Sequence, residues 1–198
     1  LWERYLLGER VEIQTIPNGV DIRHIESQFD PEQAVLNQFP FCEDHLIIGT
    51  VGRLVEQKGI QYLIESMPAV IDEHPGAKLL ILGNGPQYDK LNSLVTDLDL
   101  DDVVYLPGYV DPVFPYLPHF DLAVFPSLGE GFGLAVAEAM VAKKPIIGTN
   151  IDAFQQVVGN TGKLVEPANP SELERAINEY LSNPQLRKRD GQKGYERV

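Results

Sequence analysis

The sequence predicts an α/β fold built on a doubly wound parallel sheet. From about residue 45, short apolar runs rich in β-branched residues alternate with longer stretches that are patterned every three to four residues. Several of the short runs are apolar on both faces, as expected for parallel strands that helices cover on both sides. In such Rossmann-like folds ligands bind at the carboxyl ends of the strands, so we expect the functional residues just after strands.

The predicted elements follow in chain order. The strands are expected at 46–52, 77–83, 103–108, 121–126, 145–149 and 162–167. A helix is expected over 60–71, kinked at Pro68, and a weaker one over 86–97. Asn169, Pro170 and Glu172 provide a cap, a first-turn proline and an N3 acid for a further helix that ends near Leu181.

The first 42 residues do not continue this pattern. Residues 11–16 alternate like a strand, 17–21 contain a turn signal, and 30–39 are compatible with a short helix. We therefore predict a connecting, interdomain segment at 1–42 and a ligand-binding domain at 43–198.

Composition restricts the possible partners. The chain has 198 residues, with 16 basic and 29 acidic side chains and a formal net charge of −13, which disfavours binding to nucleic acid or to anionic lipid. No apolar run approaches the length of a membrane span, so no transmembrane segment is predicted. Cys42 is the only cysteine, which favours a reducing, cytoplasmic location. The chain lacks an initiator methionine, so we expect it to be part of a longer protein.

The segment after the first predicted strand has two cations. It reads GRLVEQKG and places Gly52 at the end of the strand, with Arg53 and Lys58 on either side of a turn. A guanidinium fork and a compact ammonium together suit a diphosphate, although two ordinary surface bases are an equal alternative for this segment alone.

The segment after the second predicted strand contains Gly83 and Gly85. It resembles the start of a dinucleotide fingerprint, but Tyr88 occupies the third glycine position. A turn through which a nucleotide approaches the backbone is one interpretation, and plain turn glycines are the other.

A third segment, SLGEGFGLAVAEAM, combines two glycines with two acids. Gly131 and Gly133 leave amide groups unshielded at the start of a predicted helix, which attracts phosphate. Glu138, expected two turns into this helix, suits a ribose diol, whereas Glu130 in the preceding loop faces what the phosphate carries. A capping acid and a partnered acid are the structural alternative.

Other polar residues are interpreted as surface groups. The acids Asp97, Asp99, Asp101 and Asp102 are interpreted as a solvated loop, and no metal site is predicted. The four histidines, His24, His45, His74 and His119, are scattered and are interpreted as surface or turn residues.

The stretch EGFGLAVAE (130–138) resembles the E-x7-E motif of retaining glycosyltransferase family 4 (group 1), whose members have the two-domain GT-B fold. The resemblance extends over about residues 11–182, because GRLVEQKG, LGNGP and PNGVD also match family segments. It implies that this chain is the C-terminal, donor-binding half of an enzyme that transfers a hexose from a nucleotide-diphosphate sugar.

The same resemblance implies the roles of individual residues. Arg53 and Lys58 would bind the diphosphate and balance its charge without a metal, and Glu130 would hold donor-sugar hydroxyls; these three are the expected catalytic residues. Glu138 would bind the ribose. The donor would also be bound at Gly52, Gly83, Gly85, Val110, Gly131, Phe132, Gly133 and Leu134.

The chain departs from the family pattern after residue 150. Residues 151–158 read IDAFQQVV, with Asp152 and Ala153 in glycine positions and Gln156 in place of a glutamate. This stretch is a hint toward GDP-mannose, so the donor is expected to be a GDP- or UDP-hexose. The acceptor is unknown, and its recognition would come from a missing N-terminal domain, which would also provide any peripheral membrane association.

Two other functions stay open. One is a non-catalytic nucleotide-sugar-binding module, which the presence of Arg53, Lys58, Glu130 and Glu138 disfavours. The other is an NAD-binding oxidoreductase domain, which Tyr88 disfavours because it breaks the glycine fingerprint.

Overall fold

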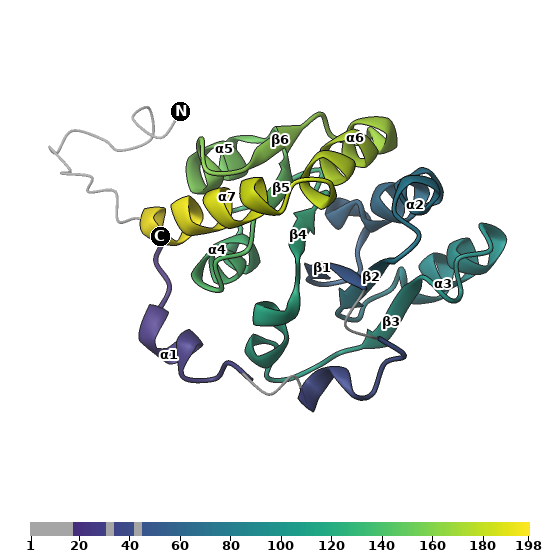
Figure 1. Ribbon diagram of the computed structural model, residues 1–198, viewed down its shortest axis with the longest axis horizontal. Helices are drawn as coiled ribbons and strands as arrows, with labels where there is room; N and C mark the ends of the chain where they lie inside the picture. The colour runs from purple at the N-terminus through teal and green to yellow at the C-terminus, as the bar shows by residue number, and fades with distance from the viewer. Residues whose placement is uncertain (1–17, 31–33, 42–44) are drawn as a thin grey trace, which may run out of the picture.

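The centre of the fold is a six-stranded parallel sheet (Figure 1). The computed structural model describes residues 18–30, 34–41 and 45–198, so the strand expected at 11–16 lies outside the described residues. The strands are β1 (Leu46–Val51), β2 (Ala77–Leu82), β3 (Val104–Gly108), β4 (Leu122–Phe125), β5 (Ile146–Thr149) and β6 (Lys163–Val165). All six predicted strands are confirmed, as is the Rossmann-like fold class.

The strand order is β3-β2-β1-β4-β5-β6. The chain builds outward from β1 to β3 and then crosses back to add β4 on the other side of β1, where Ile48 is in register with Leu122. The loops that follow β1 and β4 therefore leave the sheet in different directions. This reversal creates the crevice at which doubly wound sheets bind ligands.

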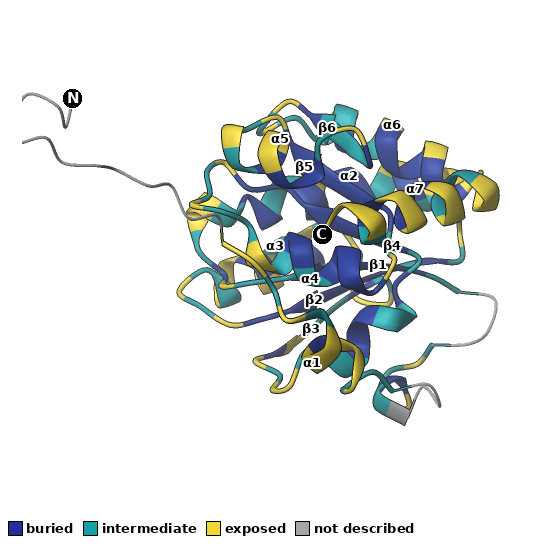
Figure 2. Ribbon diagram, turned by 90° about the vertical axis from the view of Figure 1, so that its left-hand side faces the viewer, coloured by how far each residue is buried: buried dark blue, intermediate teal, exposed yellow. Residues whose placement is uncertain are grey.

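Helices cover both faces of the sheet (Figure 2). One face packs against α2 (Ile60–Glu73), α3 (Tyr88–Asp97) and α6 (Pro170–Leu181). The other packs against α4 (Leu134–Val141), α5 (Asp152–Val158) and the 3₁₀ helix η4 (Phe114–His119). Within β2, Leu79 and Ile81 belong to the first core and Leu80 and Leu82 to the second, as the two-residue period of a strand requires.

The helix signals in the sequence have mixed outcomes. The helix expected from the Asn169 cap is confirmed as α6, with the side chain of Asn169 accepting a hydrogen bond from the Glu172 amide at 3.1 Å. The helix α2 continues through Pro68. The last helix, α7 (Pro184–Arg197), was not predicted, although Asn183 and Pro184 repeat the same cap signature.

The connecting segment forms little regular structure in its described part. Residues 18–20 have no regular structure, and Asp21 instead caps the short helix α1 (Ile22–Glu26) by accepting from the His24 amide at 3.0 Å. The helix expected at 30–39 is reduced, among the described residues, to the 3₁₀ helix η2 (Ala34–Leu36). Leu36 packs into the second core, so this segment lies against the domain that follows it.

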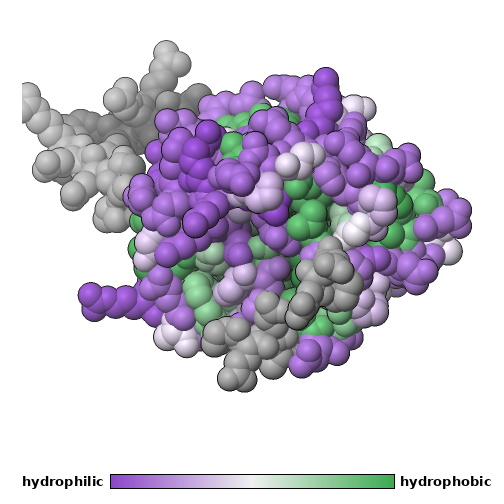
Figure 3. Space-filling view, in the orientation of Figure 1, coloured by the Kyte–Doolittle hydropathy of each residue, from purple (hydrophilic) through white to green (hydrophobic). Residues whose placement is uncertain are grey.

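The surface is largely hydrophilic on the side shown in Figure 3, where hydrophobic residues appear in several separate areas. In the parts of the chain that the structure describes, no helix has both the length and the apolar character needed to cross a bilayer.

Candidate functional site

The loops that follow β1 and β4 are joined by hydrogen bonds at the point where the strand order reverses. The backbone carbonyl of Gln57 accepts from the Leu128 amide at 2.7 Å, and the Gln57 side chain donates to the Gly129 carbonyl at 2.8 Å. Gly59 has φ +62°, and a Cβ atom there would lie 2.2 Å from the Pro126 carbonyl oxygen. Only glycine therefore permits the two loops to approach this closely.

This contact brings Lys58 and Glu130 together. Lys58 ends the 3₁₀ helix η3 (Glu56–Lys58), and its Nζ donates to Glu130 Oε1 at 2.5 Å. The same carboxylate oxygen accepts from Ser127 Oγ at 2.8 Å. The two charged side chains are only 26% and 14% exposed, so solvent weakens their attraction less than it would at an open surface.

The amides directly after Glu130 are free to bind a ligand. From Gly131 to Ala135 the backbone N–H groups donate to no residue in the described ranges. The helix α4 begins within this stretch, with Gly133 as its N-terminal cap at φ +96°. A row of unbonded amides at a helix N-terminus binds anions such as phosphate.

Glu138 lies further along α4. Because α4 begins at Leu134, Glu138 is just over one turn into the helix and not two turns as expected. Burial raises the pKa of its carboxyl group above the usual value. No described residue donates a hydrogen bond to this carboxylate, which leaves it available to a ligand hydroxyl.

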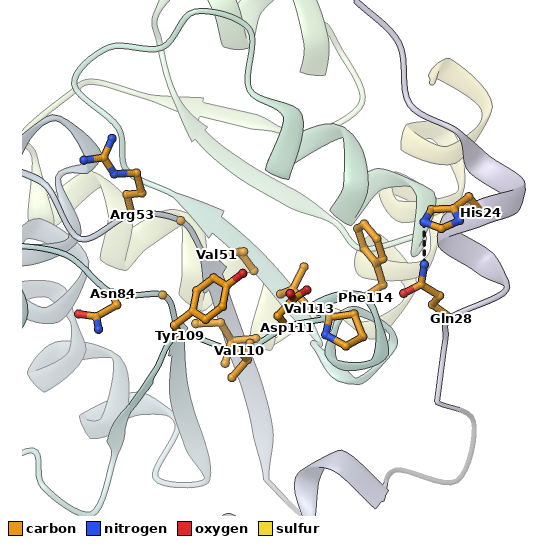
Figure 4. Close-up of a pocket in the computed structure, with 14 residues that line it drawn as sticks. His24, Gln28, Val51, Arg53, Asn84, Tyr109, Val110, Asp111, Val113 and Phe114 are labelled. Atoms are coloured by element: carbon orange, nitrogen blue, oxygen red, sulfur yellow. Dashed lines mark hydrogen bonds between the residues drawn. The ribbon is translucent and has the colours of Figure 1, made fainter.

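A cleft of about 440 Å³ lies at the carboxyl ends of β1 and β2 (Figure 4). The ends of β1 and β2 and the segment after β3 line it, with Arg53 and Asn84 at one end, His24 and Phe114 at the other, and the ring of Tyr109 between them. Arg53 is exposed and forms no hydrogen bond or ion pair with the described residues. Its guanidinium is therefore free to bind an anion at this edge of the sheet.

Gly83 and Gly85, predicted to bind the donor, have packing roles. A Cβ atom on Gly83 would lie 1.8 Å from the Gly52 carbonyl oxygen, and one on Gly85 would lie 2.4 Å from that of Leu54. Both glycines are thus needed for two loops to pack. A Cβ atom on Gly52 would lie 3.6 Å from Lys58 Cε, so the lysine side chain passes beside Gly52.

The structure does not place every predicted residue around one cavity. Gly52, Arg53, Gly83 and Val110 line the cleft, whereas Lys58 and residues 130–134 do not. Phe132 lines a separate cavity of about 390 Å³, together with residues 18–20 of the connecting segment. Gly131 and Leu134 are exposed.

Several residues of the site were not singled out from the sequence. Ser127 is buried, and its position three residues before Glu130 was the only signal for their contact. Tyr109, within the stretch 108–110 that the family resemblance places near the base of the nucleotide, is 73% exposed in the cleft. His24 is exposed, as interpreted, but it also lines the cleft, where its Nε2 forms a 2.8 Å hydrogen bond with the side-chain amide of Gln28.

Metal-binding side chains do not cluster in the described part of the chain: no three His, Cys, Asp or Glu residues lie together there as a cation site would require. In the acidic segment after α3, Asp101 accepts from Thr96 Oγ1 at 3.0 Å.

Comparison with known proteins gives consistent results. Residues 45–183 match the family model described as "Glycosyl transferases group 1". The capsular polysaccharide biosynthesis glycosyltransferase CapM of Staphylococcus aureus is 31% identical over 91% of this chain and 48% of its own length.

Two solved structures show the same fold. The C-terminal domain of a group 1 glycosyl transferase, LpcC of Francisella tularensis, is 26% identical with a TM-score of 0.78, covering 91% of this chain and 96% of that domain. A variant of TarM from S. aureus, solved in complex with UDP, is 25% identical with a TM-score of 0.72, covering 89% of this chain and 42% of TarM. The chain spans about half or less of the length of the curated relatives it matches. This chain belongs to the group 1 glycosyl transferase family.

Proposed function

We propose that this chain is the donor-binding half of a retaining, metal-independent glycosyltransferase that transfers a hexose from a nucleotide-diphosphate sugar. One observation carries the proposal: Lys58 is paired with Glu130 directly ahead of five unbonded amides, at the point where the strand order reverses. A cation and a helix N-terminus together bind a diphosphate.

The proposed chemistry follows from the charge of the leaving group. As the bond between sugar and diphosphate breaks, negative charge develops on the diphosphate. Arg53, Lys58 and the amides of residues 131–135 would stabilise that charge, which is the role of preorganised donors in transfer reactions. The positive charges of Arg53 and Lys58 would offset the negative charge of the diphosphate without a metal ion.

The two acids would bind the donor on either side of the diphosphate. Glu138 would accept hydrogen bonds from the ribose and Glu130 from the sugar. Glu130 Oε1 already accepts from Lys58 and Ser127, and these two donors withdraw charge from the whole carboxylate and make it a poorer nucleophile. We therefore favour retention by substitution on the same face of the sugar over a covalent intermediate on Glu130.

Two relatives support the assignment of this chain to the donor-binding half. The TarM structure contains UDP, and the LpcC structure is of a C-terminal domain. Because the chain spans about half of its relatives' length, acceptor recognition is assigned to a further, N-terminal domain. A cytoplasmic location, with peripheral membrane association through that domain, is part of the same proposal.

Isothermal titration calorimetry with UDP-glucose, GDP-mannose, ADP-glucose and NAD⁺ tests the proposal. Saturable binding of a nucleotide sugar supports it, whereas binding of NAD⁺ alone would support the oxidoreductase alternative. Sugar transfer by the full-length protein separates an enzyme from a non-catalytic binding module.

A further inference from the structure

A buried hydrogen-bond network lies behind the Lys58–Glu130 pair. Both Lys58 Nζ and Ser127 Oγ donate to Glu130 Oε1, at 2.5 Å and 2.8 Å. No described residue donates to Oε2, the other oxygen of the carboxylate. The carboxylate is therefore held through one oxygen, while the second oxygen is available to a ligand.

Ser127 is itself fixed by the sheet. It is 2% exposed, and its carbonyl oxygen accepts a hydrogen bond from Thr149 Oγ1. Thr149 is the last residue of β5 and is 1% exposed, at the end of a strand that reads IIGT. The rigid sheet thus determines the position of the serine, and the serine hydroxyl determines the orientation of Glu130.

We propose that Ser127 is a positioning residue that orients Glu130 so that Oε1 holds Lys58 and Oε2 accepts a hydroxyl of the donor sugar. This inference rests on the proposed function. Ser127 itself need not touch the donor. Its effect comes from preorganisation, because a carboxylate that is held at one oxygen does not have to be ordered when the sugar binds.

The proposal predicts that loss of the Ser127 hydroxyl affects the binding of two ligands differently. Removing the Ser127 hydroxyl frees Glu130 to rotate, which weakens the contact to the sugar. The nucleoside diphosphate lacks that sugar and keeps Lys58 and the amides of residues 131–135. If Ser127 had a purely structural role, its removal would instead weaken the binding of both ligands equally.

The test uses Ser127→Ala, Ser127→Thr and the matched control Ser66→Ala. Ser66 is also 2% exposed and donates to a backbone carbonyl, that of Leu63, but it lies on α2 outside the site. Calorimetry is done with UDP and UDP-glucose, and with GDP and GDP-mannose. For Ser127→Ala we expect roughly a tenfold loss of affinity for the nucleotide sugar and little change for the diphosphate, since a hydrogen bond to a charged group is removed.

The controls make the result specific. Ser127→Thr keeps the hydroxyl and should restore most of the affinity, and Ser66→Ala should not change the ratio of the two affinities. In a Glu130→Ala background, Ser127→Ala should cause no further loss, because its effect passes through Glu130. Equal losses for both ligands, or an additive loss in that background, would overturn the proposal.

A ligand-free measurement separates this proposal from the proposed function. In spectra of protein with ¹⁵N-labelled lysine, the Lys58 ammonium should exchange its protons more slowly than that of the exposed Lys90, and Ser127→Ala should remove this difference. Wild-type protein that binds none of the four ligands would contradict the proposed function. The lysine spectra would still test the role of Ser127. An unchanged Lys58 signal in Ser127→Ala would rule out the positioning role of Ser127.

Discussion

Lys58 Nζ lies 2.5 Å from Glu130 Oε1, although 72 positions separate the two residues in the sequence. Their contact joins the loop after β1 to the loop after β4, the two loops that leave the sheet in different directions. The sequence assigned the lysine to a diphosphate and the glutamate to a sugar. Under the proposed function the pairing brings the two roles together, because each residue fixes the other next to the first amides of α4.

The raised pKa of Glu138 predicts a pH-dependent affinity for nucleotides. Burial raises this pKa above the ordinary value of 4.5, so the carboxylate becomes protonated at a higher pH than an exposed glutamate does. Only the charged form accepts hydrogen bonds at both oxygens. The affinity for UDP or GDP should therefore fall as the pH is lowered toward the raised pKa, while the affinity is steady above it.

Calorimetry of Glu138→Gln over a pH series checks this expectation. The variant should bind the nucleotide roughly tenfold more weakly at neutral pH, because it loses a charged acceptor, and its affinity should fall less steeply in acid than that of the wild type, since only the diphosphate still titrates. Glu65→Gln, on the exposed side of α2, is the control and should behave like the wild type. The same pH profile in Glu138→Gln and wild type would show that Glu138 is not the titrating group.

Gly83→Ala should strongly destabilise the fold. The new Cβ atom would lie 1.8 Å from the Gly52 carbonyl oxygen, so the backbone of one loop has to move. We expect a loss of about 3 kcal/mol in the free energy of unfolding, measured by urea denaturation. Gly19→Ala is the control, since no atom lies within 4 Å of its added Cβ and its stability should be unchanged. Equal stability of the two variants would mean that the loops after β1 and β2 do not pack as described.

Lys144 predicts how stability changes at alkaline pH. Its Nζ donates to the Pro118 carbonyl at 2.5 Å, and burial lowers its pKa from 10.5 to about 8, against a smaller opposing effect of Asp121. Between these two values the unfolded chain keeps a proton that the folded chain has released. The free energy of unfolding should therefore rise with pH in this window, by at most about 1.4 kcal/mol per unit, relative to Lys144→Met.

Urea denaturation of the two proteins at pH 7 to 10 measures this difference. Lys90→Met, which removes an exposed lysine, should follow the wild type at every pH. A constant difference in stability between wild type and Lys144→Met would show that the lysine remains charged throughout.

The sequence predicted the sheet well because the strands are short, mainly apolar runs, and β4 and β5 are buried along their whole length. It predicted α6 for a similar reason, since a cap and a regular apolar stripe occur together. It did not predict α7, whose sequence PQLRKRDGQKGYER has too few apolar residues to form a stripe, although Asn183 caps it.

The candidate site was predicted residue by residue but not as an arrangement. Spacing after strands identified Arg53, Lys58 and Glu130, because the carboxyl ends of parallel strands meet at one edge of the sheet. The hydrogen bond from Thr149 to the Ser127 carbonyl depends on the packing of β4 beside β5, and no local pattern shows this packing. Some predicted residues line the cleft and others lie at the Lys58–Glu130 pair. This division likewise depends on how the loops after β1 and β4 fold, which no local pattern shows.

The most direct test of the diphosphate site is calorimetric titration of UDP and of GDP into wild-type protein, Lys58→Met, Arg53→Ala and the control Lys90→Met. Loss of a charge-assisted hydrogen bond should reduce the affinity of Lys58→Met by about 2 kcal/mol, or roughly 30-fold, with a similar loss for Arg53→Ala and none for Lys90→Met. Lys58→Met that binds the nucleotide as tightly as the wild type would contradict the placement of the diphosphate beside Lys58 and the N-terminus of α4.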